Sequence, residues 1–334
     1  MNKYNFQSNA NFTANKKEGK MDKILEVVHG SRLYGLATET SDTDIFGIYL
    51  ESKDEIIEDY FFNSNHKGRE IDLSEIVKLP SGKNSQNSID KKFFSFKKYV
   101  SRAINSNPNI NELLFVPEDK ILFNSKIGKE LLSMKEDFLS KKAYYTFGSY
   151  ARSQAKKATV KTEHFLKLED IQNKLETLPE KEYLFYFEKE KWFIDMLEVK
   201  QHHYKIKKTD YQIIKNQDVK RSIKEVEKII GQRSHRKEDI KVSGLDRKFT
   251  SHTLRLLYEC EEILKDRFIS FPIKGRDEVF AIKQGLVSLH DANKMIDEKW
   301  KDVEVANINS KLPMTANTDK IYEFVRRVYD GIIK

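Results

Sequence analysis

Two short segments, Val28 to Ser31 and Asp42 to Asp44, carry residues whose types and spacing could do chemistry. The first follows a short apolar run of strand character and reaches Gly30, whose missing side chain lets backbone N–H groups approach a phosphate closely. Ser31 would then begin a helix, where unpaired N–H donors, the positive end of the helix dipole and a hydroxyl all suit an anion. This segment therefore predicts a turn that can hold phosphate groups.

The second segment lies eleven residues after Ser31, in the strand-like stretch from Ser41 to Leu50. The two-residue period of a strand puts the carboxylates of Asp42 and Asp44 on one face. Two close carboxylates repel each other unless a cation neutralises them, and hard oxygen ligands suit Mg²⁺ or Mn²⁺. Such ions complete their coordination shells with water and substrate phosphates. Together the two segments predict phosphoryl-type transfer from a nucleotide.

The chain contains a second Gly-Ser pair at Gly148-Ser149, which serves as a comparison. The residues that follow it, from Tyr150 to Lys157, are basic and contain no paired acids. This second pair therefore cannot hold a metal ion, and we expect it to lie in a helical region.

The combination of a Gly-Ser turn with Asp-x-Asp on the next strand resembles the nucleotidyltransferase superfamily that includes DNA polymerase beta. The run from Asp90 to the Asn-Pro-x-x-x-Glu-Leu-Leu segment at Asn107–Leu114 is similar to its bacterial and phage branch associated with RNA repair (RlaP-like, or YcgL-type). The resemblance covers about Lys23 to Gly285. It departs from the pattern in the long polar loop from Pro80 to Ser88 and in Arg32, where a small residue is frequent.

The resemblance implies a third carboxylate on a neighbouring strand, which completes the metal site and accepts a proton from the attacking hydroxyl. Asp90 is the favoured candidate, at the end of a short extended stretch and before an amphipathic helix beginning at Lys91. Asp72 is its competitor, but the polar loop intervenes between Asp72 and that helix. The structural alternative for Asp90 is that it only caps the helix.

The resemblance also implies a set of nucleotide-binding residues. Gly30 and Ser31 would hold the β- and γ-phosphates, and Arg32 would either add a phosphate contact or face solvent. Farther along the chain, helical spacings of four and three put Lys248, His252 and Arg255 on one face, which could meet the triphosphate or an RNA end. The alternatives are a solvated basic face and, for His252, an interior histidine.

The activity that the resemblance implies is transfer of a nucleoside monophosphate from a nucleoside triphosphate to an acceptor hydroxyl, with Mg²⁺ or Mn²⁺ and release of pyrophosphate. An RNA 3′ end is the favoured acceptor. A protein side chain or a small molecule is the first alternative. A non-catalytic module that binds nucleic acid is the second, and the presence of both paired acids argues against it.

The expected fold class is α+β, with a small mixed-sheet core followed by a mostly α-helical domain. We expect a disordered lead-in over residues 1–20, the catalytic core over 21–122 and the helical domain over 123–334. The aromatic run from Tyr183 to Phe187 fits either a strand or a buried helical turn.

Composition limits the remaining function classes. The net charge of +8 permits nucleic-acid binding, since lysines and arginines that neutralise phosphates release counterions. The single cysteine, Cys260, excludes an internal disulfide framework and a multi-cysteine zinc site, which predicts a reducing compartment, the cytoplasm. No apolar run is long enough to cross a membrane, so no membrane partner is expected.

Overall fold

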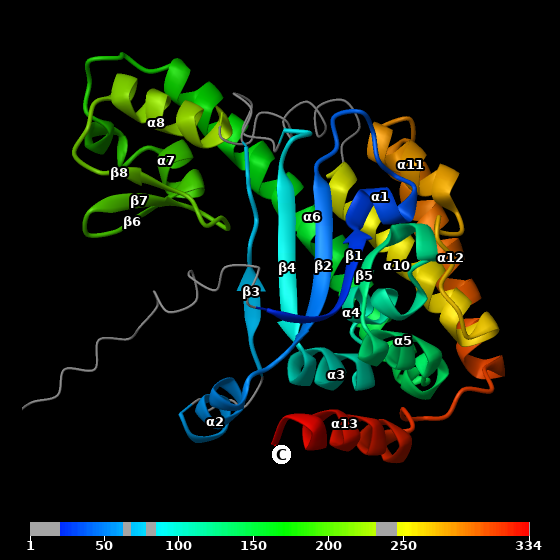
Figure 1. The fold of residues 1–334 in the computed structure, drawn as a ribbon. Helices are drawn as coiled ribbons and strands as arrows, with labels where there is room; N and C mark the ends of the chain where they lie inside the picture. Colours follow the sequence, from blue (N-terminus) through cyan, green and yellow to red (C-terminus); the bar gives the residue numbers. More distant parts are fainter. Residues whose placement is uncertain (1–20, 63–67, 78–84, 232–245, 334) are drawn as a thin grey trace, which may run out of the picture.

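The computed structural model describes residues 21–62, 68–77, 85–231 and 246–333. The expected lead-in over residues 1–20 and residues 80–84 of the polar loop lie outside this part of the chain. A five-stranded sheet forms the centre of the fold, with helices packed beside it (Figure 1). Across the sheet the strands are β3 (Glu70–Asp72), β4 (Ile89–Ser95), β2 (Thr43–Leu50), β1 (Asp22–His29) and β5 (Ile121–Asn124).

The sheet is mixed, since β2 pairs with β4 in parallel and the other three pairings are antiparallel. Its central strands bury side chains on both faces, which explains their nearly continuous apolar sequences. On one face Leu25 and Val27 join the main hydrophobic core, and on the other face Tyr49 and Phe93 form a smaller cluster. The C-terminal end of β1 and the N-terminal ends of β2 and β4 lie at the same end of the sheet, the upper end in Figure 1.

Short helices connect the strands, and serine side chains cap several of them. Ser52 accepts a hydrogen bond from the backbone N–H of Glu55, and Ser95 accepts one from that of Lys98. The elements between the strands and up to residue 138 are α1 (Gly30–Tyr34), α2 (Lys53–Phe61), α3 (Phe96–Ile104), α4 (Pro108–Asn111), η2 (Glu112–Phe115), η3 (Glu118–Lys120), α5 (Lys126–Ser133) and η4 (Lys135–Phe138).

The second half of the chain is mostly helical and shares the main core with the sheet. Leu254 and Leu257 belong to the same hydrophobic cluster as Leu25 and Val27. Gly148-Ser149 lies inside a long helix, as expected. The large helices are α6 (Lys142–Glu176), α10 (Arg247–Asp266), α11 (Arg276–Gln284), α12 (Leu289–Asn309) and α13 (Thr318–Ile333). The sequence prediction of an α+β fold with a mixed sheet followed by helices is confirmed.

A second small core lies at the far end of α6, in the upper left of Figure 1. It contains a three-stranded sheet that was not expected in the helical half, because strands of three or four residues carry almost no periodic signal. The aromatic run is a short 3₁₀ helix in which Leu184 is buried. The elements here are η5 (Leu184–Phe187), α7 (Lys191–Met196), β6 (Leu197–Val199), β7 (His203–Ile206), β8 (Gln212–Ile214) and α8 (Val219–Gly231).

The structure corrects one local prediction that bears on the site. Asp90 does not precede a helix at Lys91, because residues 89–95 form β4 and the helix begins only at Phe96. Ser95 caps that helix, so the capping alternative for Asp90 is wrong. None of the helices in the described residues is long and apolar enough to span a membrane.

Candidate active site

Three polar residues lie in register on the three central strands, at the upper end of the sheet. His29 at the end of β1 is opposite Asp44 on β2, and Asp44 is opposite Asp90 on β4. Directly paired residues on neighbouring strands point to the same face of a sheet. Asp42 precedes β2 by one residue and lies two residues before Asp44. The sheet therefore brings the predicted acids together from two strands.

The Gly30 turn lies directly against the Asp44 carboxylate. Gly30 has a positive φ of 61°, and a Cβ added to it would lie 1.8 Å from Asp44 Oδ2. An L-amino acid with a side chain could adopt this backbone conformation only at a cost and would displace the carboxylate. Glycine is thus required for both the turn and the contact. Ser31 follows on the first turn of α1, as predicted.

The acids repel one another in this arrangement. Burial raises the pKa of the Asp44 carboxyl, and the charges of Asp42 and Asp90 raise it further. His29 and Lys248 act in the opposite direction and lower it. Because Asp44 responds to all four groups, they share one electrostatic environment, and a divalent cation would relieve the repulsion between the carboxylates.

Lys283, on α11, is a site residue that the sequence did not reveal. Its ammonium donates a hydrogen bond to the carbonyl oxygen of Leu36 at 2.7 Å, in the connection between α1 and β2. Burial lowers the pKa of Lys283, Lys248 lowers it as well, and Asp42 and Asp44 raise it. Two lysines from the helical half thus approach the acid pair. No local pattern could have distinguished Lys283, since its position depends on how α11 packs beside the α1–β2 connection.

Asp90 is better placed than Asp72 to be the third acid. Asp90 is directly opposite Asp44, whereas Asp72 lies on the edge strand β3, opposite Lys92. The Asp90 carboxylate accepts a hydrogen bond from Ser74 Oγ at 3.0 Å and lies 3.0 Å from Lys92 Nζ. Its orientation is therefore set by two donors on its own side of the site.

The donor set is partly assembled for a metal ion. Asp42 and Asp44 supply the hard oxygen ligands that Mg²⁺ and Mn²⁺ prefer, and their mutual repulsion favours a cation. Within residues 21–62, 68–77, 85–231 and 246–333, no three His, Cys, Asp or Glu side chains converge closely enough to hold an ion. Asp42 and Asp44 offer two carboxylates suited to a divalent cation, and the three acids do not form a closed metal site.

Beneath the turn lies a fully buried network of charged groups. The Glu112 carboxylate lies 2.8 Å from His29 Nε2 and accepts hydrogen bonds from Tyr34 Oη and Arg255 Nη1, both at 2.6 Å. Arg255 also pairs with Glu259 at 2.6 Å. Burial disfavours ionisation of Glu112, but Arg255 and His29 lower its pKa to about 2. The network joins β1, α1, η2 and α10 below the site.

This network corrects the prediction of one basic face at Lys248, His252 and Arg255. Lys248 is exposed at the start of α10, but Arg255 is only 2% exposed and its charge is matched by the buried Glu112 carboxylate. Burial lowers the pKa of His252 to about 3, so this histidine is neutral near pH 7. Helical spacing identified residues on one side of α10, but it could not show that Glu112 covers Arg255 on that side.

Arg32 supports the turn that carries Asp42. Its guanidinium donates hydrogen bonds from Nη2 to the carbonyl oxygen of Ser41 at 2.8 Å and from Nε to that of Asp42 at 3.1 Å. The sequence suggested that Arg32 contacts phosphate or faces solvent. The observed hydrogen bonds to backbone carbonyls were not expected from either role. Arg32 thus fixes the position from which Asp42 approaches Asp44.

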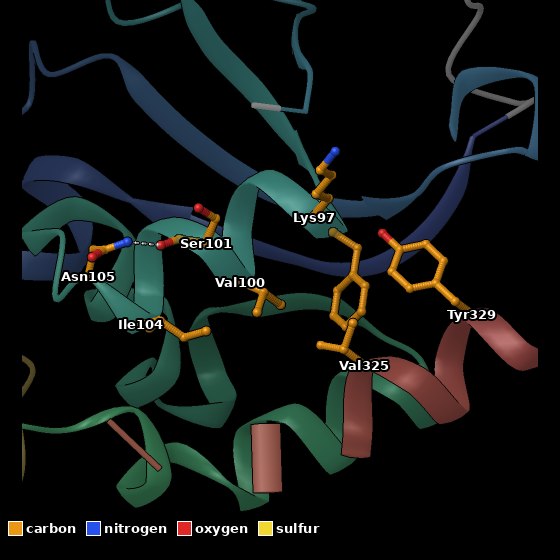
Figure 2. Close-up of a pocket in the computed structure, with 8 residues that line it drawn as sticks. Lys97, Val100, Ser101, Ile104, Asn105, Val325 and Tyr329 are labelled. Carbon is orange, nitrogen blue, oxygen red and sulfur yellow. Dashed lines mark hydrogen bonds between the residues drawn. The ribbon is translucent and has the colours of Figure 1, made fainter. Parts of the chain in front are cut away.

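A separate pocket of about 310 Å³ lies between α3 and α13, at the opposite end of β4 from Asp90 (Figure 2). Phe96, Val100, Ile104 and Val325 give it an apolar lining. The pocket is not part of the acid cluster, because the two lie at opposite ends of β4.

A mixed sheet that carries an acid pair beside a Gly-Ser turn, with a third acid on the adjacent parallel strand, is typical of polymerase-beta-like nucleotidyltransferases. The chain belongs to the RNA repair pathway DNA polymerase beta family (RlaP), whose family model matches residues 7–318. An Enterobacteria phage T4 protein, the uncharacterized 38.9 kDa protein in the nrdC-mobD intergenic region, is 21% identical over 92% of this chain and 97% of its own length. No solved structure matches the chain.

Proposed function

We propose that this protein is a metal-dependent nucleotidyltransferase that transfers a nucleoside monophosphate from a nucleoside triphosphate to the 3′ hydroxyl of an RNA. The observation that carries the proposal is the register of Asp44 with Asp90, with Gly30 packed against the Asp44 carboxylate. Family membership supports nucleotidyl transfer and a link to RNA repair.

Each residue has a defined part in the proposed reaction. Backbone N–H groups near Gly30 and the hydroxyl of Ser31 bind the β- and γ-phosphates, and the ammonium groups of Lys248 and Lys283 add positive charge. Asp42 and Asp44 would hold the divalent cation, which supplies charge stabilisation for the phosphates when bound. Asp90 accepts the proton of the attacking hydroxyl.

The reaction balances as a substitution at the α-phosphorus. The acceptor oxygen forms a bond to the α-phosphorus, the bond from that phosphorus to the β-bridging oxygen breaks, and pyrophosphate leaves. Since little covalent chemistry is required of the protein, positioning and electrostatics provide most of the rate enhancement. The buried network beneath His29 contributes by fixing the turn.

The proposed acceptor is RNA, and the net charge of +8 supports it because lysines and arginines attract a polyanion. The test is incubation of the protein with each of the four α-labelled nucleoside triphosphates, total RNA and Mg²⁺, followed by separation of RNA, protein and small molecules. We expect label on RNA and none on RNA whose 3′ end has been oxidised with periodate.

The other outcomes are equally informative. Label on protein or on a small molecule would contradict the RNA acceptor and leave the transfer chemistry in place. No incorporation into any acceptor, with RNA binding retained, would contradict the enzymatic function and favour a nucleic-acid-binding module.

A further inference from the structure

Lys92 forms an ion pair with Asp90, the candidate third carboxylate. Lys92 and Asp90 are two residues apart on β4, so their side chains point to the same face of the sheet. Lys92 Nζ lies 3.0 Å from Asp90 Oδ1 and 3.3 Å from Asp90 Oδ2, and thus contacts both carboxylate oxygens. A carboxylate whose two oxygens both contact an ammonium group has fewer lone pairs available for a metal ion.

Ser74 strengthens this orientation from the other side. Its hydroxyl accepts a hydrogen bond from the backbone N–H of Lys91 at 2.9 Å, which leaves its proton free to be donated to Asp90 Oδ1 at 3.0 Å. The Asp90 carboxylate therefore accepts hydrogen bonds from both Lys92 and Ser74. The backbone of Asp90 lies directly opposite that of Asp44, in register with it, and its carboxylate is held by Lys92 and Ser74.

The pair is also weak enough to be opened. The side chains of Lys92 and Asp90 remain 31% and 29% exposed. Ion pairs with this much access to water contribute little to stability. A divalent cation bound to Asp42 and Asp44 has twice the charge of an ammonium group and prefers carboxylate oxygen, so it can attract the Asp90 carboxylate away from Lys92.

We propose that Lys92 is a positioning residue that competes with the divalent cation for Asp90, so that the three-carboxylate site assembles only when the cation displaces the lysine. This inference rests on the proposed function in one respect, the assignment of Asp42 and Asp44 as metal ligands. Lys92 therefore weakens metal binding by the resting protein and keeps the Asp90 carboxylate oriented until the ion arrives.

The test is a titration of the purified full chain with Mn²⁺ alone, by calorimetry or by electron paramagnetic resonance of the free ion, without nucleotide or acceptor. Lys92→Ala should tighten Mn²⁺ binding about two- to fivefold, the factor that corresponds to an exposed ion pair. Lys91→Ala is the matched control, because Lys91 neighbours Lys92 on the opposite face of β4 and pairs with Glu26 at 2.7 Å. It should leave the Mn²⁺ dissociation constant unchanged.

A double substitution separates competition for Asp90 from a general effect of removing positive charge. If Lys92 acts through Asp90, Lys92→Ala should have no effect on Mn²⁺ binding in an Asp90→Ala background. An equal gain in both backgrounds, or no gain in the single variant, would overturn the inference. Failure of the unsubstituted protein to bind Mn²⁺ alone would overturn the inference, and label transfer to RNA tests the proposed function separately.

Discussion

Replacement of Gly30 by alanine should damage the site far more than the fold. The backbone of Gly30 has φ +61°, a conformation that costs an L-residue about 1–2 kcal/mol. The added Cβ would lie 1.8 Å from Asp44 Oδ2, whereas a carbon and an oxygen in contact are normally about 3.3 Å apart. The carboxylate would have to move by more than about 1 Å, and misplacement by this amount costs on the order of 100-fold in rate.

The assay is a comparison of unfolding in urea with nucleotidyl transfer and Mn²⁺ affinity for the same variant. Gly68→Ala is the matched control, since Gly68 also has a positive φ, of 68°, and its added Cβ would meet Ser95 Oγ at 2.6 Å at the far end of β4. Both variants should lose stability, and only Gly30→Ala should lose transfer by 100-fold or more. Transfer and Mn²⁺ affinity within threefold of the unsubstituted protein in Gly30→Ala would refute the proposed role of this contact.

Other substitutions separate metal binding, phosphate binding and folding. Asp42→Ala and Asp44→Ala should each lower the transfer rate by about 10³-fold or more with normal circular dichroism, and near-normal transfer in both would exclude the proposed metal pair. Lys283→Met should raise the KM for nucleotide about 10- to 100-fold, the loss expected for a charge-assisted hydrogen bond, whereas the exposed Lys294→Met on α12 should not. Because the pKa of Lys283 is lowered, nucleotide binding should also weaken as pH rises through a value below the usual lysine range. Glu112→Gln should lower the free energy of unfolding by about 3–5 kcal/mol at pH 6, which denaturant titration can measure.

The lowered pKa of Glu112 should also make the free energy of unfolding depend on pH. Its pKa is about 2 in the folded protein and near 4.5 when unfolded, so its contribution is complete above pH 4.5. That contribution is lost as pH falls from about 4.5 to about 2, since the unfolded chain then binds the proton first. Glu112→Gln should flatten this part of the stability curve. An unchanged slope would show that Glu112 is not held ionised by Arg255 and His29.

The parts of the site that the sequence predicted are those that depend on short-range geometry. The Gly30 turn, the Ser31 helix start and the placement of Asp44 on a strand follow from the local order of residues. Asp90 lies opposite Asp44 on β4, and its assignment as the third acid stays a prediction, whereas the helix expected from Lys91 is wrong. The segment after Asp90 lacks strict alternation of apolar and polar residues, since Lys91 and Lys92 are followed by Phe93 and Phe94, so its pattern does not identify a strand.

The parts that the sequence could not predict depend on contacts between distant segments. Glu112 and Arg255 are 143 residues apart, and nothing near either residue indicates that they pair. Helical spacing placed Arg255 on the side of Lys248, but only the packing of α10 against η2 shows that Arg255 is covered. Lys283 was missed for the same reason, because its hydrogen bond to Leu36 spans 247 residues.

The most direct test of the central claim compares nucleoside triphosphates labelled at the α- and γ-phosphates, with RNA as acceptor. Nucleotidyl transfer at the Gly30–Asp44 site predicts that the α-label becomes covalently attached to RNA and that the γ-label leaves as pyrophosphate. Asp44→Asn should abolish both products while leaving the fold intact. Transfer of the γ-label to the acceptor, or undiminished α-label incorporation by Asp44→Asn, would contradict the claim.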